Sequence, residues 1–191
     1  MPFAAALLVY AVAWVFGDLP PSPFRFTDEK IEMNVTADSC AIDGWYRFQN
    51  VSPFGRRTRF FYPFPMGDAD YPEFIEVMQL RGDVQIPLEF VNLSDGISYY
   101  LKIPGRGEAQ LIIRYGQKLR AKHAVYIVTT TRTWRRPLDH ALFLITHPAD
   151  FENARYTYPG REIKSDSHEV ARLIKWHRHM PDKNIEVRWG E

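Results

Sequence analysis

The run of residues 129–137 is the strongest candidate for a binding site in this sequence. It combines threonine hydroxyls with one indole and three guanidinium groups, at Arg132, Trp134, Arg135 and Arg136. Guanidinium groups bind phosphate, sulfate or carboxylate oxygens, and an indole stacks on a sugar or a base. The structural alternative is a threonine-rich strand that leads into a loop, with Trp134 covering the core. These four residues are the predicted ligand- or partner-binding residues.

Two histidines near the end of the chain are candidate metal ligands. If segment 166–178 is a strand rather than a helix, His177 and His179 share one face, where two imidazoles could hold a metal ion. Zinc sites normally need three or four ligands, and Arg178 adds a repelling charge between these two. We therefore predict no bound metal and no cofactor, with His177 and His179 as weak candidates.

Other polar clusters have simpler interpretations. Asp68, Asp70 and Glu73 form an oxygen cluster of the kind that calcium prefers, but calcium loops supply more ligands, so a solvated turn is the alternative. The tripeptide Arg81-Gly82-Asp83 matches an integrin-type motif, yet it lies where two strands already need a turn.

The sequence contains no recognisable catalytic motif. It has no Gly-x-Ser-x-Gly elbow, no Ser-x-x-Lys motif and no phosphate-binding glycine loop. Asp139 and His140 are adjacent, so a strand would point them to opposite faces. Cys40 is the single cysteine, which excludes an intrachain disulfide and multi-cysteine metal motifs. A non-enzymatic role is the prediction that follows.

Composition favours one β-rich domain without an affinity for polyanions. The 191 residues suit a single domain, and 15% aromatic residues with 14 prolines are typical of strands joined by stiff turns. The 24 basic and 23 acidic side chains give a net charge of +1, so no overall field attracts nucleic acid or an anionic membrane.

The N-terminal segment resembles an export signal. Residues 3–16 carry no charge and are followed by a break rich in glycine and proline at 17–23. This run is shorter than the roughly 20 residues of a membrane span, which favours a signal. No basic residue precedes it, however, so an uncleaved anchor or a buried first strand is the alternative. We predict a signal or anchor at 1–17, a linker at 18–29 and a β-domain at 30–191. The predicted location is outside the cytoplasm: periplasmic, cell-surface or secreted.

From Ile31 onward, apolar and polar residues alternate with the period of a half-buried strand. Three segments separated by glycine-containing turns predict a meander: 84–91, 97–103 and 109–115. Residues 184–189 are expected to close a terminal hairpin with the strand before them. The further expected strands are 31–35, 40–48, 57–61, 74–80, 124–131 and 141–146. This spacing predicts an all-β, antiparallel, two-layer sandwich.

Several short segments together resemble a group of exported prokaryotic proteins of unknown function with an immunoglobulin-like β-sandwich. The matching segments are Tyr46-x-Phe48-x-Asn50, the run Phe61-Tyr62-Pro63-Phe64-Pro65, Tyr115-Gly116-Gln117, residues 126–134 and Val187-Arg188-Trp189. The resemblance implies an immunoglobulin-like fold and export, and it implies no active site.

The predicted function is that of a non-enzymatic extracytoplasmic interaction or assembly module. Its partner would be a protein or another cell-envelope component, contacted through sheet edges or the 132–136 loop. Nucleic acid is not an expected partner, and a membrane is contacted at most through an uncleaved N-terminal segment. One alternative is an acidic-glycan-binding module that uses Trp134 with the neighbouring arginines. The second alternative is a metal-assisted hydrolase that uses His177 and His179.

Overall fold

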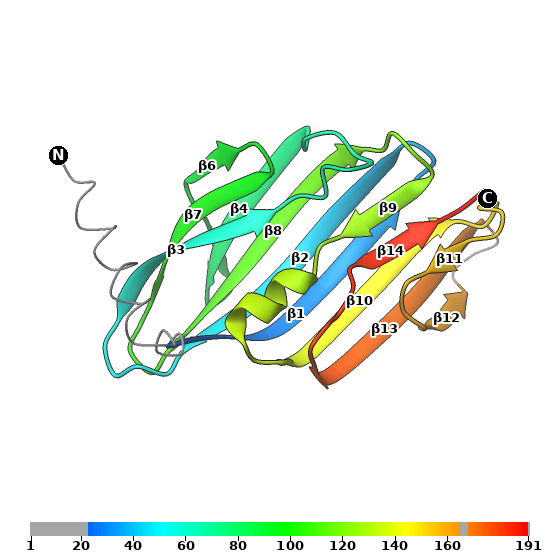
Figure 1. Cartoon of the computed structure of the whole chain (residues 1–191). Coiled ribbons are helices and arrows are strands. Elements are labelled where there is room, and N and C mark those ends of the chain that lie inside the picture. The colour runs from blue at the N-terminus through cyan, green and yellow to red at the C-terminus, as the bar shows by residue number, and fades with distance from the viewer. Residues whose placement is uncertain (1–22, 165–167, 191) are drawn as a thin grey trace, which may run out of the picture.

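The computed structural model describes residues 23–164 and 168–190, and nearly all of its regular structure is β-strand (Figure 1). The elements are β1 (Phe24–Val35), β2 (Ser39–Asn50), β3 (Arg56–Pro63), β4 (Phe74–Arg81), β5 (Val84–Pro87), β6 (Phe90–Leu93), β7 (Gly96–Ile103), β8 (Glu108–Lys118), β9 (His123–Tyr126), the 3-10 helix η1 (Thr129–Trp134), β10 (Leu138–Pro148), β11 (Arg155–Tyr156), β12 (Arg161–Lys164), β13 (Glu169–His179) and β14 (Ile185–Arg188).

The largest sheet has eight strands in the order β12-β13-β10-β1-β2-β8-β4-β5. Its strands alternate between a buried and a hydrated face, as period-two sequences require. In β1, for example, Ile31 and Met33 are each 1% exposed, whereas Lys30 and Glu32 lie on the opposite face and form an ion pair of 3.1 Å. The β1–β10 ladder is parallel, and the other ladders of this sheet are antiparallel.

The outer face of the large sheet is covered by charged pairs between neighbouring strands. Arg114 on β8 contacts Asp43 on β2 at 2.8 Å and Glu76 on β4 at 3.6 Å. Each of these side chains keeps at least a third of its surface in solvent, so the pairs contribute little net stability. Their main consequence is that this face stays hydrated while the other one is buried.

Two three-stranded sheets cover the inner face of the large sheet, with strand orders β3-β7-β6 and β11-β14-β9 (Figure 1). Tyr62 of β3 packs against Tyr46 of β2, with ring centroids 5.8 Å apart. Tyr126 of β9 packs against Phe143 of β10, with centroids 6.2 Å apart. The core therefore lies between one large layer and two small sheets that form the second layer.

The predicted all-β class and antiparallel sheets are confirmed, and the segment left open between strand and helix is a strand, β13. The immunoglobulin-like strand order is not confirmed, because one large sheet faces two small ones and contains a parallel pair. Residues 1–22, which hold the predicted signal or anchor, lie outside the described residues. In the part of the chain that the structure describes, no helix combines the length and the apolar character of a membrane span.

One predicted strand is divided, and two predicted strand pairings are wrong. The divided strand is the segment 84–91, which consists of β5, paired with β4, and the start of β6, paired with β7. β7 does not pair with β8, because the turn at 104–107 carries the chain from a small sheet into the large one. The expected terminal hairpin is also absent, since β14 pairs with β9 and β11 rather than with β13.

Candidate functional site

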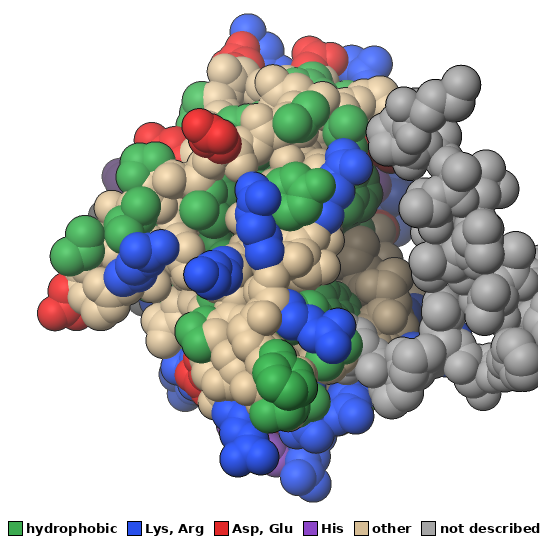
Figure 2. All heavy atoms as spheres, turned by 90° about the vertical axis from the view of Figure 1, so that its left-hand side faces the viewer, with side chains coloured by type: hydrophobic (Ala, Val, Ile, Leu, Met, Phe, Trp, Pro, Cys, Tyr) green, Lys and Arg blue, Asp and Glu red, His purple; other side chains and the backbone are tan. Residues whose placement is uncertain are grey.

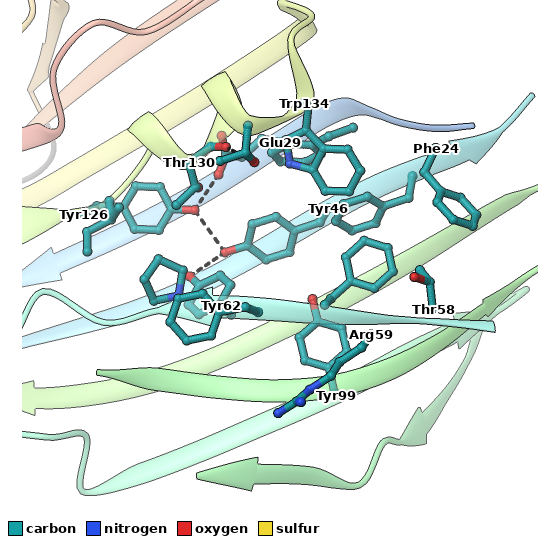
Figure 3. Close-up of a pocket in the computed structure, with 17 residues that line it drawn as sticks. Phe24, Glu29, Tyr46, Thr58, Arg59, Tyr62, Tyr99, Tyr126, Thr130 and Trp134 are labelled. Carbon is teal, nitrogen blue, oxygen red and sulfur yellow. Dashed lines mark hydrogen bonds between the residues drawn. The ribbon is translucent and has the colours of Figure 1, made fainter. Parts of the chain in front are cut away.

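A cleft of about 380 Å³ lies between the two small sheets, and β1 and β2 of the large sheet form its floor (Figure 3). β3 and β7 supply one wall, and the end of β9 with η1 supplies the other. Ten of its lining residues are aromatic: Phe24, Phe26, Tyr46, Phe48, Phe60, Phe61, Tyr62, Tyr99, Tyr126 and Trp134. An apolar, concave surface with a few polar groups is the usual form of a small-molecule site.

Glu29 is the one carboxylate among the residues that line this cleft. It occupies an inner-face position of β1, in phase with Ile31 and Met33, and is 4% exposed. Tyr126 donates a hydrogen bond to its Oε1, whereas its Oε2 is buried and has no hydrogen-bond partner among the described residues. Burial raises the pKa of Glu29 to about 8, against the opposing effect of the Tyr126 hydrogen bond.

Three tyrosine hydroxyls extend from Glu29 across the cleft (Figure 3). The hydroxyl of Tyr46 lies 3.1 Å from that of Tyr126 and 2.8 Å from that of Tyr62. These residues come from β2, β9 and β3, so the network joins the large sheet to both small sheets. Burial raises the pKa of each phenol well above its ordinary value, which keeps all three protonated at neutral pH.

Gly44 makes room for this network. An added Cβ at Gly44 would lie 2.1 Å from the hydroxyl oxygen of Tyr46, two residues along the same strand. The Tyr46 ring therefore lies back over the glycine instead of standing upright on the sheet. A side chain at position 44 would force the ring away and move its hydroxyl from those of Tyr62 and Tyr126.

Trp134 belongs to this cleft, whereas the three arginines of its sequence cluster do not line it. The predicted strand 124–131 ends at Tyr126, and η1 follows it, with Arg135 in a left-handed conformation (φ 53°) at its end. The half-buried indole packs against Phe48 and Phe60, with ring centroids 5.6 Å and 5.7 Å away. Arg132 turns elsewhere, and its Nε donates to the carbonyl of Pro181 at 3.0 Å.

The weak metal candidates are not brought together. His177 faces His140 on the neighbouring strand β10, with 3.3 Å between their Nδ1 atoms. Arg178 has a φ of 48°, which interrupts the alternation of the strand, and His179 packs instead against Trp176, with ring centroids 4.5 Å apart. Across residues 23–164 and 168–190, no group of three or more His, Cys, Asp or Glu side chains is placed to hold a metal ion.

The carboxylates of the suggested calcium loop each have a basic partner. Asp70 contacts Arg120 at 3.3 Å, and Glu73 contacts Lys118 at 2.8 Å. Asp68 lies 2.7 Å from Nδ1 of the buried His123, and this hydrogen bond lowers the pKa of Asp68. The solvated-turn interpretation therefore describes this loop better than a calcium site does.

A second surface with chemical character is the outer face of the β3-β7-β6 sheet. Figure 2 views the molecule from the side of these strands, where Lys and Arg side chains alternate with hydrophobic ones. Phe61 and Tyr100 are each 50% exposed, and the Arg57 guanidinium lies 4.3 Å from the centroid of the Tyr100 ring. This cation–π contact covers part of the apolar surface, which is otherwise open to solvent.

Glu29 and its tyrosine partners were missed at the level of the sequence. A detectable signal existed, because Glu29 is an acid in phase with the apolar residues Ile31 and Met33 of a strand. A charge on the buried face of a strand is rare unless it is paired, so it marks a position of interest. The tyrosines gave no such signal, since aromatic residues on an inner face are ordinary core residues.

No protein-family model matches this chain, and no curated protein sequence matches it. Solved structures do match. A putative nutrient binding protein from Legionella pneumophila aligns at a TM-score of 0.63 and 13% identity, over 87% of this chain and 67% of that one. An M1 zinc metallopeptidase from Deinococcus radiodurans aligns at a TM-score of 0.52 and 11% identity, over 91% of this chain but 44% of that one. At these identities the likeness shows the shared fold alone.

Proposed function

We propose that this chain is a non-enzymatic binding module of the extracytoplasmic space, and that it holds a small molecule in the cleft between its two small sheets. The observation that carries the proposal is Glu29, which lines an aromatic cleft and whose buried Oε2 lacks a hydrogen-bond partner within the described residues. Such an atom costs about 1–3 kcal/mol while it is unsatisfied. A ligand that supplies the missing hydrogen bond recovers that free energy.

The shape of the cleft supports the same role. Its volume of about 380 Å³ lies within the range of small-molecule sites. The hydrogen-bonded tyrosines connect β2, in the floor of the cleft, to β3 and β9 in its two walls. These connections keep the site preformed and limit the entropy lost on binding. The Legionella protein of similar fold is named as a binding protein, which agrees with this role. The metallopeptidase likeness covers less than half of that enzyme and supplies no reaction for this chain.

The two alternative functions have weaker support. An acidic glycan would need Trp134 and the arginines around one ligand, yet Arg132, Arg135 and Arg136 do not line the cleft that Trp134 lines. A metal-assisted hydrolase would need His177 and His179 on one ion, and these side chains pack against different neighbours. The small-molecule role therefore has the better geometric support, and the partner in the cell envelope stays a prediction.

The experiment is a ligand screen on the purified protein by thermal shift, followed by calorimetric titration of each hit. The screen contains amines, amino acids, sugars, uronic acids and short carboxylic acids. A blocking variant, Thr130→Phe, places a ring at the cleft beside Glu29 and is expected to abolish binding. The control, Thr146→Phe, makes the same change on β10 at a position outside the cleft and is expected to leave binding intact. Binding that survives Thr130→Phe, or a screen without hits, would overturn the proposal.

A further inference from the structure

The chemistry of the cleft also indicates which class of ligand it takes, an inference that rests on the proposed function. We infer that the cleft binds an organic ammonium group, with Glu29 as the counter-ion and the aromatic side chains around the body of the ligand. The contacts of Glu29 carry the argument. One carboxyl oxygen accepts from Tyr126, and the other has no partner in the described part of the chain.

When Glu29 is ionised, its free oxygen calls for a hydrogen-bond donor that the described part of the protein does not supply. A carboxylate accepts several hydrogen bonds, and a primary ammonium donates three. Once Glu29 is ionised, it would repel a ligand carboxylate at this position. A ligand hydroxyl could donate one hydrogen bond to the ionised form, but it would leave the buried charge without compensation.

The walls of the cleft favour a cation as well. The rings of Phe48, Phe60 and Trp134 lie close to one another, with centroid distances between 4.9 Å and 5.7 Å. The face of an aromatic ring attracts a cation, most strongly for tryptophan, and this attraction increases where water is excluded. The same rings offer apolar contact to an alkyl or aryl body, so a primary amine with a hydrophobic body fits both features.

The other ionisable groups around Glu29 do not compete for this role. Tyr126 from β9, Tyr46 from β2 and Tyr62 from β3 stay neutral, since burial raises the pKa of each phenol. Arg59 of β3 also lines the cleft and keeps its positive charge, but its side chain is exposed to solvent and its Nε donates to Ser98 of the neighbouring strand. On the outer face of the sheet, Asp28 pairs with Arg47 at 3.6 Å, and the exposed His140 of β10 contacts His177.

Ammonium binding has a proton-linked signature. The pKa of Glu29 is about 8 without ligand, so about nine in ten molecules carry the proton at pH 7. An ammonium favours the ionised carboxylate, so binding at pH 7 releases close to one proton per ligand. The affinity for an amine therefore rises with pH, about tenfold per pH unit below pH 8, and levels off above it.

The test compares three probes that share one body: 2-phenylethylamine, 2-phenylethanol and phenylacetate. Calorimetric titration at pH 8.5 is expected to show the amine binding about tenfold or more tightly than the other two, because a charged hydrogen bond exceeds a neutral one. Titration at pH 7 in buffers of different ionisation enthalpy is expected to show proton release with the amine and none with the alcohol. The release needs no variant, so it tests Glu29 even if its substitution prevents folding.

The variant Glu29→Gln keeps an oxygen that can accept from Tyr126 and removes the charge. It is expected to bind the amine and the alcohol equally, without proton release, while Glu32→Gln on the outer face of the same strand behaves like the parent protein. Equal affinity of the parent for all three probes would overturn the ammonium inference and leave the cleft as a binding site. Failure of all three probes, with only compounds that lack an ammonium group bound in the cleft, would also overturn it. If no compound binds the cleft, the proposed function itself fails.

Discussion

Glu29→Gln tests whether the buried carboxyl is protonated in the folded protein. The pKa of Glu29 is raised from its ordinary value of 4.5 to about 8 by burial. Between these two values the folded state holds a proton that the unfolded state has released. Raising the pH through this window therefore favours unfolding. The parent protein is most stable, with respect to this group, below pH 4.5, and the destabilisation is complete above pH 8.

The size of the effect follows from the same two pKa values. Each tenfold change in an acidity constant corresponds to about 1.4 kcal/mol, so the full change from 4.5 to about 8 amounts to about 5 kcal/mol. Glutamine has no proton to lose, so Glu29→Gln should remove this pH dependence. We expect the variant and the parent to have similar stability at pH 4.5. At pH 7 we expect the variant to be more stable by about 3 kcal/mol.

The assay is urea unfolding of both proteins at five pH values between 4.5 and 9, followed by circular dichroism. The measured quantity is the difference in free energy of unfolding between variant and parent at each pH. The control is Glu32→Gln, in which the replaced side chain is 45% exposed and forms a surface ion pair. A Glu29→Gln difference that stays constant across the range would refute the reasoning, because Glu29 would then ionise in the fold as it does in water.

Four further substitutions test the neighbourhood of the cleft. Gly44→Ala should lower the free energy of unfolding by about 1–3 kcal/mol, because its Cβ would lie 2.1 Å from the Tyr46 hydroxyl; an unchanged melting temperature would contradict this. Tyr46→Phe should lower the free energy of unfolding, measured in urea, by about 1–3 kcal/mol, since the hydroxyls of Tyr62 and Tyr126 each lose a partner. An unchanged free energy would mean that a water molecule replaces the lost hydroxyl. Trp134→Ala should destabilise the fold by about 2 kcal/mol, whereas Arg135→Gly should stabilise it by about 1 kcal/mol by relieving a left-handed φ of 53°. Thermal melts of the two single variants would separate these effects, and shifts of the same sign would argue against them.

Local features of the fold were predictable from the sequence, because they depend on neighbouring residues. The alternation of buried and exposed side chains in β1 and β2 follows from the two-residue period of a strand. The turn at Arg81-Gly82-Asp83 follows from the conformational freedom of glycine, and Gly82 has a φ of 60°. Strand pairing depends on contacts between distant segments, which periodicity does not report. The turn at 104–107 looks the same in sequence whether it closes a hairpin or carries the chain between two sheets.

The candidate site was less predictable than the fold for the same reason. Glu29 and Tyr126 are 97 positions apart, and only the packing of β9 over β1 brings them together. Trp134 was predicted at a site, yet its geometric partners are the aromatic residues of the cleft rather than the adjacent arginines. Composition identified the right indole, and the three-dimensional arrangement determines which groups act with it.

The parallel pairing of β1 with β10 has a consequence for how the chain folds. Asp28 lies opposite His140, so more than a hundred residues separate strands that are adjacent in the large sheet. Closing such a distance is entropically costly and slows folding relative to a sheet built from hairpins. During synthesis, β1 keeps an open backbone edge until β10 has left the ribosome, and an open edge can pair with another chain. The yield of folded protein should therefore fall with expression rate, as association between nascent chains competes with the arrival of β10.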